Sequence, residues 1–396
     1  MQRTGSACSL HLLGLVTIWV CASCDGQQTD LISSGTASGG ASPSKLGTAK
    51  TVTLVGVTIS PGFATTGELT IAFTALDASN QPLFATPMDS APTKAEQGWL
   101  AQEAKPDAAI VVTAKGHACT QAGLDLQRPQ AAAGKLAVTT LLDESGSMKD
   151  NDPSALRAEA TRALLKVVCA APTNLFGVFD FGACGQSTGG QVACQPGATA
   201  TRDLLAADAS KLTGPPPWVP CAQANLQVAD QALAKYVQPV GDTPLFQSVL
   251  ETCQQMAANR ATGGVLAGPS LAMVVMSDGI NFTNLKTERQ AAEACIKANA
   301  LRVCTVGLGE GSELSANPNP QAVADLRALA TTGNCTYAAA TNAQALQGVF
   351  NGLGVAVKDG HNRVRVVVKP IPVAGTAVSG QLKVGSAQAD FSFVPL

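Results

Sequence analysis

Hydrophobic periodicity divides the chain into two kinds of region. From Thr51 to about Lys115, and again after Gly360, apolar residues recur at every second position. The clearest examples are Leu69, Ile71, Phe73, Val364, Val366, Val368, Phe391 and Phe393. A period of two predicts half-buried antiparallel strands. Because about 35 C-terminal residues are too few to bury a core alone, we expect residues 359–396 to pack with residues 51–133 as a β-sandwich-like domain.

Between these regions, from residue 134 to residue 358, apolar runs alternate with segments of helical period. The strand candidates are Lys135–Leu142, Leu175–Phe181, Leu271–Ser277, Leu301–Gly307 and Thr336–Ala338. Helical faces begin near Leu156, Leu245 and Val323. Continuous apolar strands that are separated by helices predict an α/β domain, with a mostly parallel central sheet covered on both faces.

Composition narrows the class of protein. The chain has 396 residues, which is long enough for two or three domains. Its net charge is −2 and it has no basic run, so we expect no nucleic-acid partner. Only 14% of its residues are charged, where roughly a quarter is usual. Small and uncharged polar residues replace them, a composition that fits an exported protein.

The first 24 residues have the pattern of an export signal. An apolar run, Leu10–Val20, leads into Cys21-Ala-Ser-Cys24, which resembles a bacterial lipoprotein processing site. We therefore expect a lipid on Cys24 that anchors the protein to the bacterial membrane, at the outer membrane, in the periplasm or on the cell surface. Cys21 stands where such sites usually have leucine, and ordinary secretory cleavage is the alternative. Residues 25–50 are mostly small and polar, which predicts a flexible linker.

The cysteines also indicate export. The chain has twelve, and nine remain if Cys8, Cys21 and Cys24 are discounted. That many thiols in an oxidising compartment predicts disulfide bonds. Two pairs can be suggested, Cys184 with Cys194 and Cys304 with Cys335, whereas the other pairings cannot be predicted. The odd number leaves one thiol unpaired, or shared with a partner.

Oxygen-bearing side chains stand where two of the predicted parallel strands end. Asp143, Ser145 and Ser147 share one tight loop after the first strand, and Asp278 follows a later one. Thr243 stands at the start of a helix between them. In such sheets, ligands bind beyond the carboxyl ends of strands, where the strand order reverses. If the two strands are neighbours there, two carboxylates and three hydroxyls come together.

This set of donors predicts a site for a divalent cation. Magnesium prefers oxygen ligands in octahedral geometry at about 2.0–2.1 Å and keeps several waters when protein ligands are few; manganese and calcium are the alternatives. If only one carboxylate binds directly, the ion stays electron-poor and attracts a carboxylate from outside. The pattern therefore favours a docking site over a reaction centre.

These segments together resemble the metal-ion-dependent adhesion site of von Willebrand factor type A domains, which integrins also contain. They are Asp143-Glu-Ser-Gly-Ser147, Thr243 in Gly-Asp-Thr-Pro-Leu, and Asp278 in Ser-Asp-Gly. The resemblance extends from about Lys135 to Val357. It implies a Rossmann-like sheet with the strands of Asp143 and Asp278 side by side. It also implies that Ser145, Ser147 and Thr243 are hydroxyl ligands, and that both aspartates bind directly or through water.

One segment departs from the family. Residues 182–240 are longer than the usual link and contain Cys184, Cys194 and Trp218 after three prolines. Such loops could shape the choice of partner or could be a clamped insertion, and we expect Trp218 to be buried.

The residues favour binding over catalysis. There is no GxSxG motif, and His117 and His361 lie outside the central domain, where we expect them at the surface. We therefore predict no enzyme but an envelope-anchored adhesion module that captures an acidic residue of a protein ligand through the cation. The alternatives are a structural scaffold in which the cation mainly stabilises loops, and an intact site that serves no partner.

Overall fold

The computed structural model describes residues 45–86, 93–96, 99–129, 135–182, 199–235, 239, 241–261, 263–279, 281, 286–315 and 317–395. The predicted signal, Cys24, residues 25–44 and the suggested Cys184–Cys194 pair lie outside these residues. No helix in the described part of the chain is both long and apolar enough to cross a bilayer.

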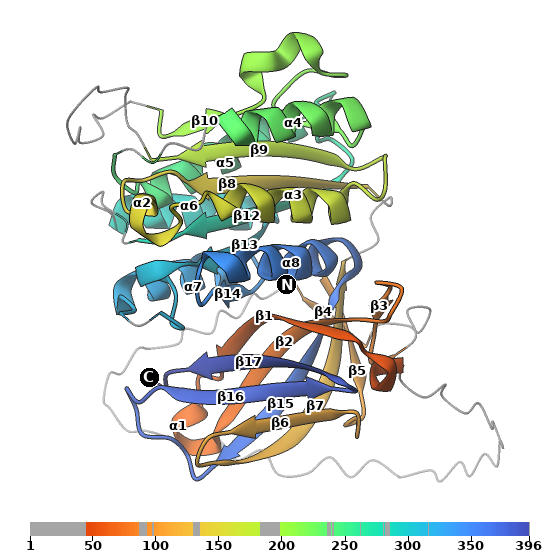
Figure 1. Cartoon of the computed structure of the whole chain (residues 1–396), viewed down its shortest axis with the longest axis vertical. Coiled ribbons are helices and arrows are strands. Elements are labelled where there is room, and N and C mark those ends of the chain that lie inside the picture. Colours follow the sequence, from red (N-terminus) through yellow and green to blue (C-terminus); the bar gives the residue numbers. More distant parts are fainter. Residues whose placement is uncertain are drawn as a thin grey trace, which may run out of the picture. The chain divides into compact units, whose positions relative to one another are not determined.

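An α/β unit has the predicted, largely parallel sheet (Figure 1). Its strand order is β10-β9-β8-β12-β13-β14, with β11 beside β9. The strands are β8 (Leu136–Asp143), β9 (Leu175–Phe181), β10 (Thr201–Asp203), β11 (Val219–Pro220), β12 (Ser270–Ser277), β13 (Arg302–Gly307) and β14 (Tyr337–Ala339). Strands β9, β8, β12, β13 and β14 are parallel, whereas β10 and β11 run antiparallel to β9. The five strands predicted from continuous apolar runs are therefore confirmed.

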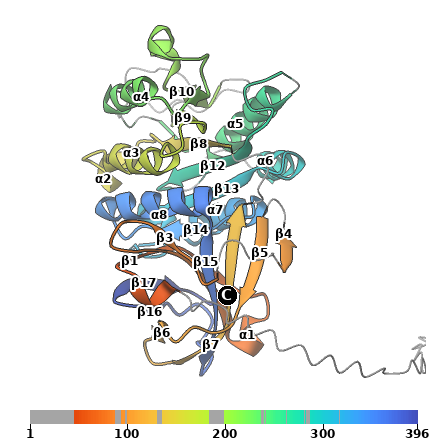
Figure 2. The ribbon, with the colours of Figure 1, turned by 90° about the vertical axis from the view of Figure 1, so that its right-hand side faces the viewer.

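Helices cover both faces of this sheet (Figure 2). Those of the unit are α2 (Met148–Asn151), α3 (Leu156–Val168), α4 (Gln223–Lys235), α5 (Leu245–Arg260), α6 (Lys286–Ala298), α7 (Pro320–Thr332) and α8 (Leu346–Asp359). Helices α3, α4 and α8 share one apolar cluster with the sheet, and α5, α6 and α7 share the other. Because each face of the strands is buried, their apolar runs are continuous rather than alternating. Short 3₁₀ helices are η2 (Ala206–Lys211), η3 (Gly309–Gly311) and η4 (Ala343–Ala345).

Two antiparallel sheets form a second part of the fold from both ends of the chain. One has the order β1-β2-β15-β7-β5-β4, with β3 beside β2, and the other has the order β17-β16-β6. The strands are β1 (Thr51–Ile59), β2 (Glu68–Leu76), β3 (Pro82–Leu83), β4 (Lys94–Glu96), β5 (Trp99–Ala104), β6 (Ile110–Ala114), β7 (Ala118–Pro129), β15 (His361–Lys369), β16 (Val378–Val384) and β17 (Ala387–Phe393). Short helices are η1 (Lys45–Thr48) and α1 (Phe63–Thr66). The late strand β15 pairs with the early strands β2 and β7.

The linker is shorter than predicted. Leu46 and Ala49 are buried in the same apolar cluster as the strands of the two antiparallel sheets. The Ser386 hydroxyl donates a hydrogen bond of 2.9 Å to the Ala49 carbonyl oxygen. Residues 45–50 therefore belong to the folded β region. Their small and polar composition concealed two apolar positions that pack against it.

The two parts of the fold share a core. Val55 and Ala72 belong to the apolar cluster that also contains α3 and α8. A Cβ added at Gly352 of α8 would lie 2.6 Å from Thr53 Cγ2. This approach of α8 also buries Thr74, which by alternation points away from the face of Leu69, Ile71 and Phe73. Alternation of apolar and polar residues therefore does not predict which face of β2 is exposed, because this strand is covered on both faces.

Three disulfide bonds lie within the described residues. They join Cys169 with Cys221, Cys253 with Cys295, and Cys304 with Cys335. The third confirms the pair suggested from the sequence, and the other two were not predicted. Cys119 forms no disulfide with another described residue. These bonds are typical of a protein that matures outside the reducing cytoplasm.

The sequence predicts that Trp218 is buried and that His117 and His361 lie at the surface. Trp218 is buried as predicted, and its indole nitrogen donates a hydrogen bond of 2.8 Å to Thr139 Oγ1. His117 is partly exposed. The prediction for His361 is wrong: it is buried at the start of β15. Burial, together with the nearby Arg363 and Arg302, holds the pKa of His361 well below its usual range, so the imidazole is neutral.

Candidate metal centre

The predicted ligands gather where the strand order of the parallel sheet reverses. Strands β8 and β12 are parallel neighbours, and they lead into two different loops. Asp143 is the last residue of β8, and Ser277 is the last of β12. The Ser277 hydroxyl donates a hydrogen bond of 2.6 Å to Asp143 Oδ2. Parallel pairing therefore brings Asp143 and Asp278 to the same edge of the sheet, as predicted.

The loop after β8 connects the two aspartates through its hydroxyl groups. The Ser145 amide donates to Asp143 Oδ1 over 2.8 Å. Ser145 Oγ and Ser147 Oγ lie 3.1 Å apart, and Ser147 Oγ donates to Asp278 Oδ1 over 2.8 Å. Four of the five predicted residues thus form one continuous chain of hydrogen bonds.

Thr243, the fifth predicted residue, lies at the same place. The Gly146 amide donates a hydrogen bond of 3.0 Å to the Gly241 carbonyl, which joins the first loop to the segment before α5. A Cβ added at Gly279 would lie 3.5 Å from Thr243 Oγ1 and 3.7 Å from Ser147 Oγ. Both hydroxyls therefore flank Gly279, directly after Asp278. The structure brings all five predicted residues together.

The two carboxyl groups of the centre are buried close to each other. Asp143 and Asp278 both have 0% exposure. Burial raises the pKa of Asp143, and burial followed by the charge of Asp143 raises the pKa of Asp278 to about 7. Among the described residues, no lysine or arginine forms an ion pair with either one. Two buried carboxylates without a paired cation are costly, so this pair favours a bound positive charge.

The donor set fits a hard divalent cation. It consists of carboxylate and hydroxyl oxygens, which magnesium, manganese and calcium accept. No cluster of three His, Cys, Asp or Glu side chains suitable for a metal exists among the described residues. A cation at this edge of the sheet would therefore depend on hydroxyl ligands as well as on the two aspartates.

The raised pKa of Asp278 predicts how stability depends on pH without a cation. The pKa of this carboxyl has its ordinary value of 3.8 in the unfolded chain and is raised to about 7 in the folded chain. Between these values the folded chain keeps a proton that the unfolded chain has released, so the free energy of unfolding falls as pH rises. One proton gives a slope of up to about 1.4 kcal/mol per pH unit.

Thermal unfolding in a chelating buffer, repeated across this pH range, measures that slope. We expect Asp278→Asn to make it shallower by the contribution of one proton, because the amide does not titrate, whereas Asp143, whose pKa is also raised, still does. A cation-free protein whose stability rises with pH over the same range, and equally so in the variant, would contradict the assignment.

A buried ion-pair network that the sequence did not reveal supports the first loop. Arg157 of α3 is completely buried and contacts Glu144 and Asp152. Its two ion-pair distances are 2.7 Å to Glu144 Oε2 and 2.8 Å to Asp152 Oδ2. The Glu144 amide also donates to the Phe181 carbonyl over 2.6 Å. Arg157 therefore fixes both ends of the loop that carries Ser145 and Ser147.

Two further side chains contact the aspartates without having been predicted. Ser277 donates to Asp143, and Asn151 Nδ2 donates to Asp278 Oδ2 over 2.9 Å. Ser277 could have been suspected, because it precedes Asp278 at the end of a strand. The sequence Asn151-Asp-Pro-Ser154 indicates the start of a helix, and nothing in it indicates a contact with Asp278.

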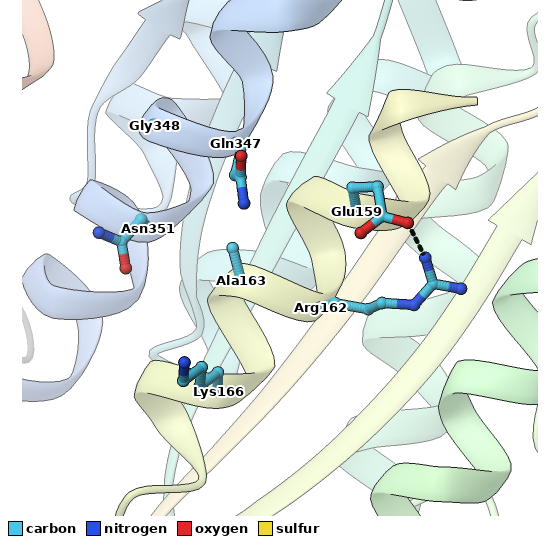
Figure 3. Close-up of a pocket in the computed structure, with 7 residues that line it drawn as sticks. All are labelled: Glu159, Arg162, Ala163, Lys166, Gln347, Gly348 and Asn351. Carbon is cyan, nitrogen blue, oxygen red and sulfur yellow. Dashed lines mark hydrogen bonds and ion pairs between the residues drawn. The ribbon is translucent and has the colours of Figure 1, made fainter. Parts of the chain in front are cut away.

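A groove of about 470 Å³ between α3 and α8 is separate from the centre (Figure 3). Its charged lining residues are Glu159, Arg162 and Lys166, and Glu159 is paired with Arg162. None of the five predicted residues lines it.

Among known proteins, this chain is similar to several whose structures have been solved. No protein-family model matches the chain, and no curated protein matches it. A von Willebrand factor type A structure from Catenulispora acidiphila is 12% identical, with a TM-score of 0.42, and the match covers 72% of this chain and 73% of that one. Manganese-loaded TRAP protein from Plasmodium vivax is 13% identical, with a TM-score of 0.35, and the match covers 72% of this chain and 98% of that one.

A third similar structure is proximal thread matrix protein 1 from the mussel byssus, in which zinc occupies the metal-ion-dependent adhesion site (MIDAS) motif. It is 12% identical, with a TM-score of 0.37, and the match covers 56% of this chain and 48% of the mussel chain, about half its length. The solved structures that resemble this chain thus include a von Willebrand factor type A structure, a structure with a zinc-occupied motif and a manganese-loaded structure. Identities this low concern the fold alone, so the roles of Asp143 and the hydroxyls depend on the geometry described above.

Proposed function

We propose that this protein is a metal-ion-dependent binding module that captures an acidic residue of a protein ligand. The observation that carries the proposal is the convergence of two buried carboxylates and three hydroxyls at the reversal of the sheet. Ser145, Ser147 and Thr243 would supply hydroxyl ligands, and Asp143 and Asp278 would balance the charge. A divalent cation held there supplies an electrophilic position for a carboxylate from outside.

The exposure of the centre supports docking from outside. Asp143, Ser145, Thr243 and Asp278 are buried, whereas Ser147 is exposed, so the centre meets solvent at Ser147. The hydrogen-bond partners of the two carboxylates are serine, asparagine and backbone groups, none of which is a general base near neutral pH. In the proposed site both carboxylates serve the cation, so neither is left to act as a base. We therefore propose binding rather than catalysis, with magnesium as the first candidate cation.

The contacts between the loops favour adhesion over a scaffold in which the cation mainly holds the loops. Protein groups already join them: Gly146 to Gly241, and Ser277 to Asp143. The Phe246 amide also donates to Asn281 Oδ1 over 3.2 Å. A loop framework that is hydrogen-bonded in this way does not depend on the cation for its shape.

The place of the protein in the cell is part of the proposal. Three disulfides fit an oxidising compartment. Residues 25–44 would connect a lipid on Cys24 to the folded part. We propose that the module is anchored in this way at the bacterial envelope.

Affinity capture tests the proposed function. We expect the immobilised full chain to retain envelope proteins in magnesium and to release them in a chelator. Retention should be lost when carboxylates in the extract have been amidated beforehand, because the outside ligand is a carboxylate. Thr243→Val should abolish retention, since it removes one hydroxyl while keeping the shape of the side chain.

Thr252→Val is the matched control, because Thr252 is buried in α5 away from the centre. Unfolding of the wild-type chain on chelation would favour the scaffold instead. Equal retention by the amidated and untreated extracts would contradict capture through a carboxylate.

A further inference from the structure

Asn151 holds one oxygen of Asp278 away from the hydroxyl groups of the centre. Asn151 Nδ2 donates to Asp278 Oδ2 over 2.9 Å, and Ser147 Oγ donates to Asp278 Oδ1 over 2.8 Å. The two donors lie on opposite oxygens, so together they fix the rotation of the carboxylate. Only Oδ1 is turned toward Ser147 and, through it, toward Ser145.

The Asn151 amide is itself held in place. Asn151 ends the short helix α2, and its backbone amide donates to the Ser147 carbonyl over 3.2 Å. Its side chain packs on Gly309, where an added Cβ would lie 2.5 Å from Asn151 Cγ. Gly309 has a φ of +52°, a conformation that favours glycine. The loop that seats Asn151 also contacts Asp278 directly, because the Gly311 amide donates to the Asp278 carbonyl over 3.1 Å.

The orientation of this carboxylate matters for the choice of cation. Calcium takes six to eight oxygens and often uses both oxygens of one carboxylate. Magnesium requires near-octahedral geometry at a shorter distance and dehydrates reluctantly. A carboxylate whose second oxygen is directed to an amide offers one oxygen to the centre. This arrangement disfavours bidentate binding and therefore disfavours calcium relative to magnesium.

We propose that Asn151 is a positioning residue that confines Asp278 to one ligating oxygen and so makes the centre select small octahedral cations over calcium. The inference rests on the proposed function, because it assumes that a cation binds between these residues. It adds a residue outside the predicted ligand set, and it assigns to that residue the specificity for the metal rather than the binding itself.

Calorimetric titration of the full chain with magnesium chloride and, separately, calcium chloride tests this role. The measured quantity is the dissociation constant for calcium divided by that for magnesium. For Asn151→Ala we expect this ratio to fall about tenfold, because the loss of a partner of a metal ligand typically weakens metal binding by about 10–100-fold and the released Asp278 oxygen favours calcium. The matched control is Asn351→Ala, which removes a half-buried asparagine from α8 and should leave the ratio unchanged.

A second variant distinguishes a change in cation choice from misfolding of Asn151→Ala. Asn151→Asp keeps the shape of the side chain, cannot donate to Asp278, and adds an oxygen, so the ratio should again shift toward calcium. If the affinities of both variants for the two cations change equally, or not at all, Asn151 has only a structural role and the inference is overturned. If the wild-type chain binds neither cation, the proposed function fails, and the inference fails with it.

Discussion

Replacing Arg157 with methionine is expected to lower the free energy of unfolding by about 3–5 kcal/mol, the usual cost of removing one partner from a buried ion pair. Arg157 has 0% exposure, and it is paired with Glu144 and Asp152, which are also buried. Methionine fills a similar space but leaves two carboxylates without a cation. Burial already raises the pKa of Glu144 even with Arg157 present, so its charge depends on that pairing. Urea denaturation of the full chain, followed by circular dichroism, measures the loss.

Arg162→Met provides the matched control for this change. Arg162 lies on the same helix and forms ion pairs with Glu159 and Asp230, but its side chain is 26% exposed. Pairs of this kind contribute about 0–1 kcal/mol. If Arg157→Met and Arg162→Met cost the same small amount, Arg157 does not fix the loop as described.

Much of the centre could be predicted because its ligands depend on short-range rules. An apolar run that ends in a polar residue marks the carboxyl end of a buried strand, and Asp143 and Asp278 both stand there. In a parallel sheet, such ends meet at one edge. The sequence could not prove that β8 and β12 are neighbours, and the structure establishes this.

Residues whose role depends on tertiary contacts could not be predicted. Arg157 follows Leu156 at the start of a helix, where a charged residue is usually solvated, and only its contacts with Glu144 and Asp152 explain its burial. His361 is buried for a related reason, since β15 pairs with β7, which lies more than 200 residues earlier. The alternation of apolar residues in β15 predicts which side chains face the core of the β region. It does not predict that other parts of the chain also cover the opposite face of the strand at His361.

The disulfides likewise include one pair that could be predicted from the sequence and two that could not. Cys304 and Cys335 were suggested because each lies at a predicted strand, and strand neighbours can be inferred. Cys169–Cys221 and Cys253–Cys295 connect helices or loops across 52 and 42 residues. Those pairings depend on how α3 and α5 pack, which no local pattern specifies.

Asp143→Ala is expected to have the largest effect on cation binding. Asp143 accepts hydrogen bonds from the Ser145 amide and the Ser277 hydroxyl, so it organises the loop as well as supplying charge. We expect its loss to weaken binding at least about 100-fold, the upper end of what loss of an outer partner of a metal ligand costs. Asp150→Ala is the matched control, because Asp150 is an exposed residue of α2 and carries the same charge. Solvent and salt screen its field.

The most direct test is calorimetric titration of magnesium or manganese chloride into the full wild-type chain and these two variants, under identical conditions. The account predicts one site in the wild-type chain, a similar site in Asp150→Ala, and no measurable site in Asp143→Ala. Binding to Asp143→Ala with wild-type affinity would show that Asp143, Ser145, Ser147, Thr243 and Asp278 do not hold the cation.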